Sequence, residues 1–392
     1  MEDDQAVYQD LRRHLHRMPV GYPATRSGVE IRILKRIFTP RQAALALFLT
    51  HGFETADAVF KRVERSRPGW ADREECRLLL EEMAQNGGVF CRVMEGRSHF
   101  ALFPFVIGMF EFQLNRMSPG LYEDTARYFR EGYALEYLST KIPQMRVIPV
   151  ETAVDETLHI ATYDEVRRLV YEAGDRIGVA ECICRKGKDL MDAPCRATNR
   201  RSLCFGLRDY FDAGIRYGWL RKVDREEALA ILAQSEKDGL VLQSTNEQNP
   251  QAVCACCGCC CGILGTLRQV PNRAAYAAGN FYAAPDPALC VGCGKCASRC
   301  HVDAVVFREG RAVVRPEECI GCGVCVPVCK KGAMALSSRP EQHVPPRDTE
   351  ELYDVIGRGR HPLSKVKTVS RLGWDWLGRK VREKKGYKWT GS

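Results

Sequence analysis

One cysteine spacing occurs twice between residues 290 and 329, and this repeat constrains the fold more than any other feature of the sequence. The pattern CxxCxxCxxxC is formed first by Cys290, Cys293, Cys296 and Cys300, then by Cys319, Cys322, Cys325 and Cys329. Four thiolates can hold one zinc ion, or they can hold the four iron atoms of a cubane cluster. One zinc ion would leave four of the eight cysteines unused, so the repeat favours two [4Fe–4S] clusters.

The repeat resembles the dicluster ferredoxin domain of bacterial iron–sulfur proteins, in which the fourth cysteine of each repeat binds the cluster of the other. By this resemblance, one cluster is held by Cys290, Cys293, Cys296 and Cys329, and the other by Cys319, Cys322, Cys325 and Cys300. The glycines beside these cysteines leave room for backbone N–H groups to approach the sulfides of the clusters; they are Gly292, Gly294, Gly321 and Gly323. A hairpin of residues 302–307 and 312–314 is expected between the repeats. His301 and Lys330 stand where the family usually has proline.

Ten more cysteines lie in the middle of the chain, between residues 182 and 261. They are Cys182, Cys184, Cys195, Cys204, Cys254, Cys256, Cys257, Cys259, Cys260 and Cys261. Thiolates this dense would repel one another or oxidise unless a metal neutralised them. We therefore expect one or two further [4Fe–4S] clusters, with ligands from both ends of the segment. The sequence leaves open which thiol binds which iron, and a cluster with an open corner could also bind a substrate.

The whole chain, from about residue 30 to residue 338, resembles a family of bacterial 4Fe–4S proteins. These proteins join a winged-helix-like N-terminal domain, an ECxCR…CxCCxCCC middle segment and a dicluster ferredoxin domain. The residues that carry the resemblance are Thr39-Pro40, 103–112, 181–185, 254–261 and the two quartets. The resemblance implies no substrate.

Residues 30–115 predict three helices and a hairpin, the order of a winged-helix domain. The helices begin at Thr39-Pro40, Thr55 and Asp72, and the hairpin comprises residues 89–94 and 98–103. The third helix would read DNA in such a domain, but residues 72–86 carry five acids against two arginines. Because phosphate neutralisation supplies much of the affinity for DNA, this helix argues against DNA as a partner and favours docking or scaffolding.

The predicted fold class is α+β, with a cysteine-rich α/β middle segment. The expected units are a loose leader (1–29), the winged-helix-like domain (30–115), a helical connector (116–150), the middle segment (151–285), the ferredoxin domain (286–338) and a basic tail (339–392). The connector predicts one helix at about 121–138. In the middle segment we expect a helix capped by Thr162, a strand at 177–180, a helix capped by Asp224, a polar loop at 243–251 and a helix at 263–269.

The positive charge of the chain is concentrated at its C-terminal end. Residues 356–392 contain eleven Lys or Arg and two acids, a net charge of +9 that equals the formal charge of the whole chain. Trp374, Leu377 and Val381 share one face of a possible helix there. Such a basic helix could contact an anionic membrane surface or an acidic partner.

No nucleotide-binding motif and no export signal are found, so the chain is expected to be cytoplasmic and to keep its thiols reduced. His159 and Glu181 are candidate acid–base residues, but nothing pairs them with a nucleophile, and no catalytic residue is assigned. We expect an electron-transfer protein of anaerobic habit that serves a redox enzyme or receives electrons from a donor protein. Two alternatives remain: an oxidoreductase with its own site at the middle cysteines, and a redox-sensing DNA-binding regulator.

Overall fold

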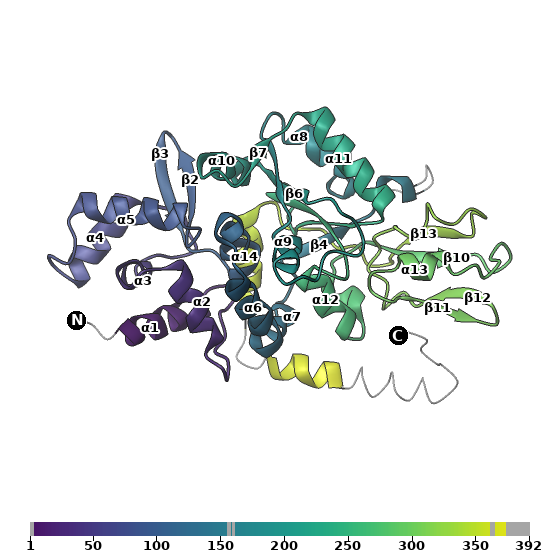
Figure 1. Ribbon diagram of the computed structural model, residues 1–392, viewed down its shortest axis with the longest axis horizontal. Helices are drawn as coiled ribbons and strands as arrows, with labels where there is room; N and C mark the ends of the chain where they lie inside the picture. The colour runs from purple at the N-terminus through teal and green to yellow at the C-terminus, as the bar shows by residue number, and fades with distance from the viewer. Residues whose placement is uncertain (1–3, 155–157, 159–160, 361–364, 374–392) are drawn as a thin grey trace.

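The computed structural model describes residues 4–154, 158, 161–360 and 365–373. It is a mixed helix-and-sheet structure, as predicted, with N-terminal helices at one end, a six-stranded sheet in the middle and two small two-stranded sheets at the other end (Figure 1). Within these residues, no helix combines the length and the apolar character needed to cross a bilayer.

The three helices and the hairpin expected in residues 30–115 are confirmed. The side chains of Thr39, Thr55 and Asp72 each accept a hydrogen bond from the backbone three residues later, which caps the three helices. The elements are α3 (Pro40–Ala46), α4 (Ala56–Ser66), α5 (Arg73–Gln85), β2 (Phe90–Met94) and β3 (Arg97–Ala101), with β1 (Glu54–Thr55) beside β3. The likeness to a winged-helix domain stays a prediction.

The expectation of a loose leader at residues 1–29 is wrong. Residues Asp4–His16 form α1, and α2 (Val29–Ile37) follows. Val7, Leu11 and Leu15 lie one turn apart on α1, and all three are buried. An apolar stripe of this spacing stabilises a helix by packing against the core. Charged and polar residues separate these positions, so the apolar spacing was not recognised as a helix from the sequence.

The connector is helical where a helix was expected, and it then enters the sheet. Residues 119–138 form α6 (Pro119–Tyr128), η3 (Phe129–Tyr133) and α7 (Ala134–Leu138). The following residues form β4 (Met145–Ile148), which the sequence did not predict. β4 pairs with β8 as an edge strand of the sheet.

The middle segment is built on a six-stranded antiparallel sheet with the order β4-β8-β9-β6-β5-β7. Its other strands are β5 (Ile177–Glu181), β6 (Ser202–Leu207), β7 (Arg221–Lys222), β8 (Val241–Thr245) and β9 (Ala252–Cys256). The helices around it are α8 (Val166–Glu172), α9 (Ile183–Asp189), α10 (Arg208–Arg216), α11 (Arg225–Asp238) and α12 (Gly262–Gln269).

Two local predictions in this segment need correction. The polar loop expected at 243–251 begins later, because residues up to Thr245 belong to β8 and pair with β4 and β9. Thr162 does not cap a helix: it starts the short turn η5 (Thr162–Asp164), and α8 begins at Val166 without a side-chain cap. Asp224 caps α11 as predicted, by accepting a hydrogen bond from the Glu227 backbone.

The ferredoxin-like end consists of two small antiparallel two-stranded sheets and a short helix. β10 (Phe281–Pro285) pairs with β13 (Met334–Ser338), and β11 (Val305–Arg308) pairs with β12 (Arg311–Val314), which confirms the predicted hairpin between the repeats. Helix α13 (Lys295–Arg299) lies in the first repeat. Buried Asp164 ties this end to the sheet, since it pairs with Arg146 of β4 and accepts a hydrogen bond from the Asn280 amide at 2.9 Å.

The tail expected from residue 339 is partly structured. Residues Thr349–Arg358 form α14, which lies in the middle of the molecule (Figure 1). Its Leu352 and Ile356 are buried in the same core as apolar residues of the N-terminal helices. Glu247 fixes its start by accepting a hydrogen bond from the Thr349 hydroxyl at 2.7 Å. Trp374, Leu377 and Val381 lie outside the described residues.

Because Glu247 is buried, we expect the stability of the folded protein to depend on pH. Burial raises its pKa to about 7, although Thr349 and Thr245 donate hydrogen bonds to it. Its pKa in the unfolded chain is near 4.3, so the folded protein binds the proton more tightly, and this carboxyl lowers the free energy of unfolding as pH rises from about 4 to about 7. The loss is on the order of 3 kcal/mol.

The variant Glu247→Gln removes this titration. We expect its denaturation midpoint to exceed that of the wild type at pH 8 and to approach it at pH 5, as measured by urea unfolding of anaerobic protein. Glu350→Gln, on the exposed side of α14, is the control and should follow the wild type at both values. Equal pH dependence in Glu247→Gln and the wild type would contradict the prediction.

Candidate metal centre

The eight ferredoxin cysteines lie in the two loops that flank the β11–β12 hairpin. Cys290 and Cys293 precede α13, Cys296 belongs to it, and Cys300 ends it. Burial raises the pKa of Cys319 and Cys322, and the nearby thiolate of Cys300 raises both further. Cys300 of the first repeat therefore lies near these two thiols of the second repeat.

Backbone N–H groups point at three of these thiols. Cys300 accepts a hydrogen bond from Ala304 at 3.2 Å, Cys290 from Ala312 at 3.3 Å and Cys319 from Ala283 at 3.3 Å. Hydrogen bonds from Ala312 and Gly292 lower the pKa of Cys290. Such donors stabilise thiolates and tune the potential of a cluster, so the loops fit [4Fe–4S] clusters.

His301 joins the ferredoxin loops to the middle cysteines. Its Nδ1 accepts a hydrogen bond from the Gly258 backbone at 3.2 Å, and its Nε2 lies 2.7 Å from the Gly239 carbonyl oxygen, to which it donates. A Cβ at Gly258 would lie 2.5 Å from the His301 carbonyl oxygen, so the two backbones are in close contact. The residue that replaces the family's proline thus holds the two cysteine-rich segments together.

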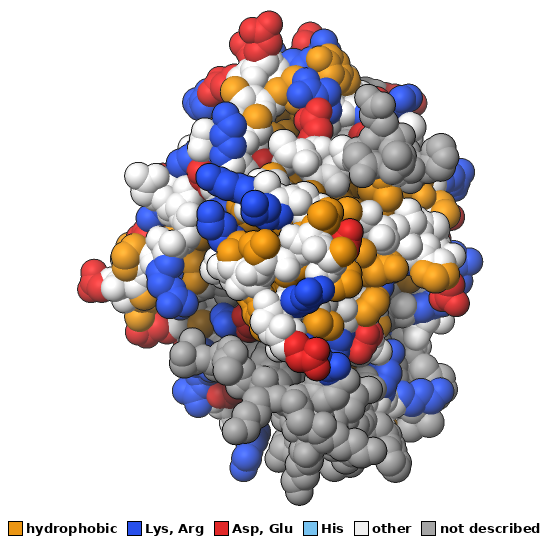
Figure 2. Space-filling model, turned by 90° about the vertical axis from the view of Figure 1, so that its right-hand side faces the viewer, with side chains coloured by type: hydrophobic (Ala, Val, Ile, Leu, Met, Phe, Trp, Pro, Cys, Tyr) orange, Lys and Arg blue, Asp and Glu red, His pale blue; other side chains and the backbone are white. Residues whose placement is uncertain are grey.

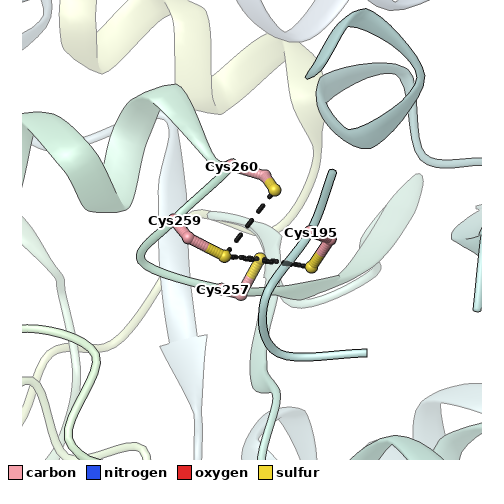
Figure 3. Close-up of side chains that lie close together, drawn as sticks. All are labelled: Cys195, Cys257, Cys259 and Cys260. Carbon is pink, nitrogen blue, oxygen red and sulfur yellow. Dashed lines mark hydrogen bonds between the residues drawn. The ribbon is translucent and has the colours of Figure 1, made fainter. Parts of the chain in front are cut away.

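Four of the ten middle cysteines form a tight group, which we call the four-thiol group: Cys195, Cys257, Cys259 and Cys260 (Figure 3). The Sγ atom of Cys195 lies 3.6 Å from that of Cys257 and 3.8 Å from that of Cys259. Cys259 lies 3.5 Å from Cys257 and 3.7 Å from Cys260. Hydrogen bonding from Cys260 and the charge of Arg185 lower the pKa of Cys257 to about 5.

The other six middle cysteines line a cavity of about 590 Å³, the six-thiol cavity, whose wall Cys257 and Cys260 also reach. They are Cys182, Cys184, Cys204, Cys254, Cys256 and Cys261. Neighbouring thiols of the cavity wall interact with one another. Cys182 interacts with Cys184 and Cys204, and Cys254 interacts with Cys204 and Cys256. No three of these six thiols lie within 4.8 Å of one another, whereas the four-thiol group, alone among the described residues, has all of its ligand atoms within that distance.

The alternation of strand β9 explains why the thiols divide in this way. Cys254 and Cys256 are two residues apart in the strand and therefore share a face of the sheet, whereas Cys257 is the first residue after the strand and packs in a different core. Cys204 lies opposite Cys254 on β6 and adds a thiol to the cavity side. Cys256 packs in the core that holds the N-terminal helices, whereas Cys257 and Cys260 pack in the core beneath α8 and α11.

Arg185 lies between the two thiol sets and is completely buried. Its Nε donates to Cys195 Sγ at 3.4 Å, its Nη1 donates to the Ala255 carbonyl at 2.9 Å, and its Nη2 is buried without a partner. Negative charge on Cys182, Cys257 and Cys256 would stabilise the guanidinium, and these thiols raise its pKa despite its burial. A buried cation needs nearby negative charge, and metal-bound thiolates supply it.

Among the polar side chains of the cavity wall are Glu111, Tyr122 and Gln243. Burial raises the pKa of Glu111 to about 8, although the Gly108 N–H donates to it at 2.8 Å. Gln243 Nε2 lies 3.7 Å from Cys261 Sγ. The sequence did not identify these three as site residues: Gln243 was expected in a loop, and Glu111 lies about 70 residues before the first middle cysteine.

The candidate acid–base residues are not part of this site. Glu181 is exposed and pairs with Lys186 at 3.3 Å, outside the wall of the six-thiol cavity. His159 lies outside the described residues. Cys76 and Cys91 are buried in the N-terminal unit.

Comparison with known families supports the ferredoxin part. Residues 274–333 match the model of the 4Fe-4S dicluster domain, a stretch that contains both quartets. No curated protein and no solved structure shows significant similarity to the chain. The chain is thus an iron–sulfur protein that carries a dicluster domain near its C-terminal end.

Proposed function

We propose that the chain is an electron-transfer protein whose two ferredoxin clusters exchange single electrons with a further cluster in the six-thiol cavity. The observation that carries the proposal is the dicluster match over both quartets. The proposed ligands are those that the family resemblance implies, and Cys300 beside the second loop supports the exchange of fourth ligands. Each [4Fe–4S] cluster supplies one-electron chemistry when bound.

The contact between the two segments supports an electron path. Cys300 is a proposed ligand of the second cluster, and the next residue, His301, accepts a hydrogen bond from Gly258 at 3.2 Å. Gly258 lies between Cys257 and Cys259, and Cys257 reaches the cavity wall. A short chain of covalent and hydrogen bonds therefore connects the ferredoxin loops to the middle cysteines.

The outer end of the ferredoxin domain supports a protein partner. Cys293 is exposed, and Val291 and Leu289 beside it are 63% and 49% exposed. Figure 2 shows hydrophobic side chains among Lys and Arg on this end of the molecule. Apolar side chains next to a cluster ligand suit brief docking of a redox enzyme or an electron-donor protein.

An EPR-monitored reductive titration of anaerobic protein tests the proposal. The expected result is reversible one-electron reduction of at least two clusters, with magnetic interaction between them. Cys293→Ser should weaken or alter one signal and leave the other, and Cys91→Ser should match the wild type. Iron that stays EPR-silent and unreactive toward a strong reductant would count against electron transfer.

The six-thiol cavity supports a second candidate, an oxidoreductase with its own substrate site. A cubane needs four thiolates, so the cavity has two to spare, besides Glu111 and Tyr122. Turnover of a small molecule without an added protein would favour the enzyme. The regulator has less support, because Glu81 on the expected reading helix α5 pairs with Arg216 of the middle segment at 3.0 Å.

A further inference from the structure

We infer that the four-thiol group is a mononuclear zinc site, separate from the iron–sulfur clusters. The expectation of one or two further cubanes then reduces to one cubane, in the six-thiol cavity. The inference concerns a different set of thiols from those that carry the proposed function, so each can fail without the other.

The spacing of the thiols carries this inference. Zinc binds thiolates at about 2.3 Å in a tetrahedron, which places neighbouring sulfur atoms about 3.8 Å apart. Four Sγ distances in the group lie between 3.5 and 3.8 Å. A cubane inserts its own core of iron and sulfide between the thiolates and therefore holds them further apart than a single ion does.

The ferredoxin loops of the same chain provide an internal comparison. Their eight cysteines match a dicluster domain, yet no set of them lies within the 4.8 Å that encloses the four-thiol group, as far as the described residues go. The structure thus distinguishes thiols spaced for a cubane from thiols spaced for one ion. In the six-thiol cavity too, no three thiols lie within that distance of one another.

The surroundings of the group match a structural metal with a net negative charge. Four thiolates around Zn²⁺ carry a charge of −2, and the Arg185 guanidinium that donates to Cys195 at 3.4 Å balances part of it. The four ligands come from the loop after α9 and from the turn after β9. A zinc ion would fasten this loop to the turn that contacts His301, and so stabilise the junction with the ferredoxin domain.

Metal analysis of anaerobically purified full-length protein tests the inference. We expect about one zinc per chain in addition to the iron, and X-ray absorption at the zinc edge should show four sulfur neighbours at about 2.3 Å. Cys195→Ser should lower the zinc content and leave the iron of the ferredoxin domain unchanged. Cys76→Ser, at a buried cysteine outside both thiol sets, should retain all of the metal.

The wild-type measurements keep the test decisive even if Cys195→Ser fails to fold. Wild-type protein with iron and no zinc, with mononuclear iron in the group, or with zinc bound by nitrogen or oxygen would overturn the inference. Iron without zinc would leave the electron-transfer proposal intact, whereas zinc without iron would overturn that proposal and not this one.

Discussion

Replacing Arg185 by methionine is expected to release metal from both middle thiol sets and to destabilise the fold. The guanidinium is completely buried, donates to Cys195 and to the Ala255 carbonyl, and faces the thiolates of Cys182 and Cys257. Leaving a buried charge without its partner costs about 3–5 kcal/mol. We therefore expect lower zinc and iron contents and a lower denaturation midpoint in Arg185→Met.

A nearby arginine provides the matched control. Arg201 pairs with Asp189 in the same segment, but its side chain is 25% exposed, and such pairs contribute about 0–1 kcal/mol. Arg201→Met should keep its metals and most of its stability. If Arg185→Met retained wild-type zinc, iron and stability, the account of Arg185 as the balancing charge would be wrong.

The second large effect is expected from Gly292→Ala in the first ferredoxin loop. Gly292 has a φ of 68°, and a Cβ there would lie 2.0 Å from the Gly310 carbonyl oxygen at the β11–β12 turn. Backbone atoms cannot yield as a flexible side chain does, so the loop and the hairpin must separate. The variant should lose one cluster, about four iron atoms per chain.

Gly294 separates the steric cause from backbone strain. It has a φ of 78°, yet a Cβ would meet no atom within 4 Å. Alanine in the left-handed region costs about 1–2 kcal/mol, so Gly294→Ala should be less stable but should keep its iron. Equal iron contents in Gly292→Ala and Gly294→Ala, measured on anaerobic protein, would show that the contact with Gly310 does not matter.

The features that the sequence predicted are those determined by nearby residues. Thr39, Asp72 and Asp224 cap helices through bonds that span three residues, so their pattern is visible in the sequence. Each ferredoxin loop places three cysteines within seven residues, and the spacing alone indicates a cluster.

Features that depend on distant residues were missed or left open. β4 pairs with β8 about 100 residues later, and Glu111 reaches the thiols from a segment with no cysteine. The alternation in residues 254–257 could have placed Cys257 apart from Cys254 and Cys256. No local pattern links Cys195 to it, because the loop after α9 brings it there only in the folded chain.

The most direct test of the central claim is a count of iron and acid-labile sulfide in anaerobically purified wild-type protein. The account predicts at least about eight of each per chain, and about twelve when the six-thiol cavity is loaded. A colourless protein whose ferredoxin cysteines hold zinc, with neither iron nor sulfide, would contradict it.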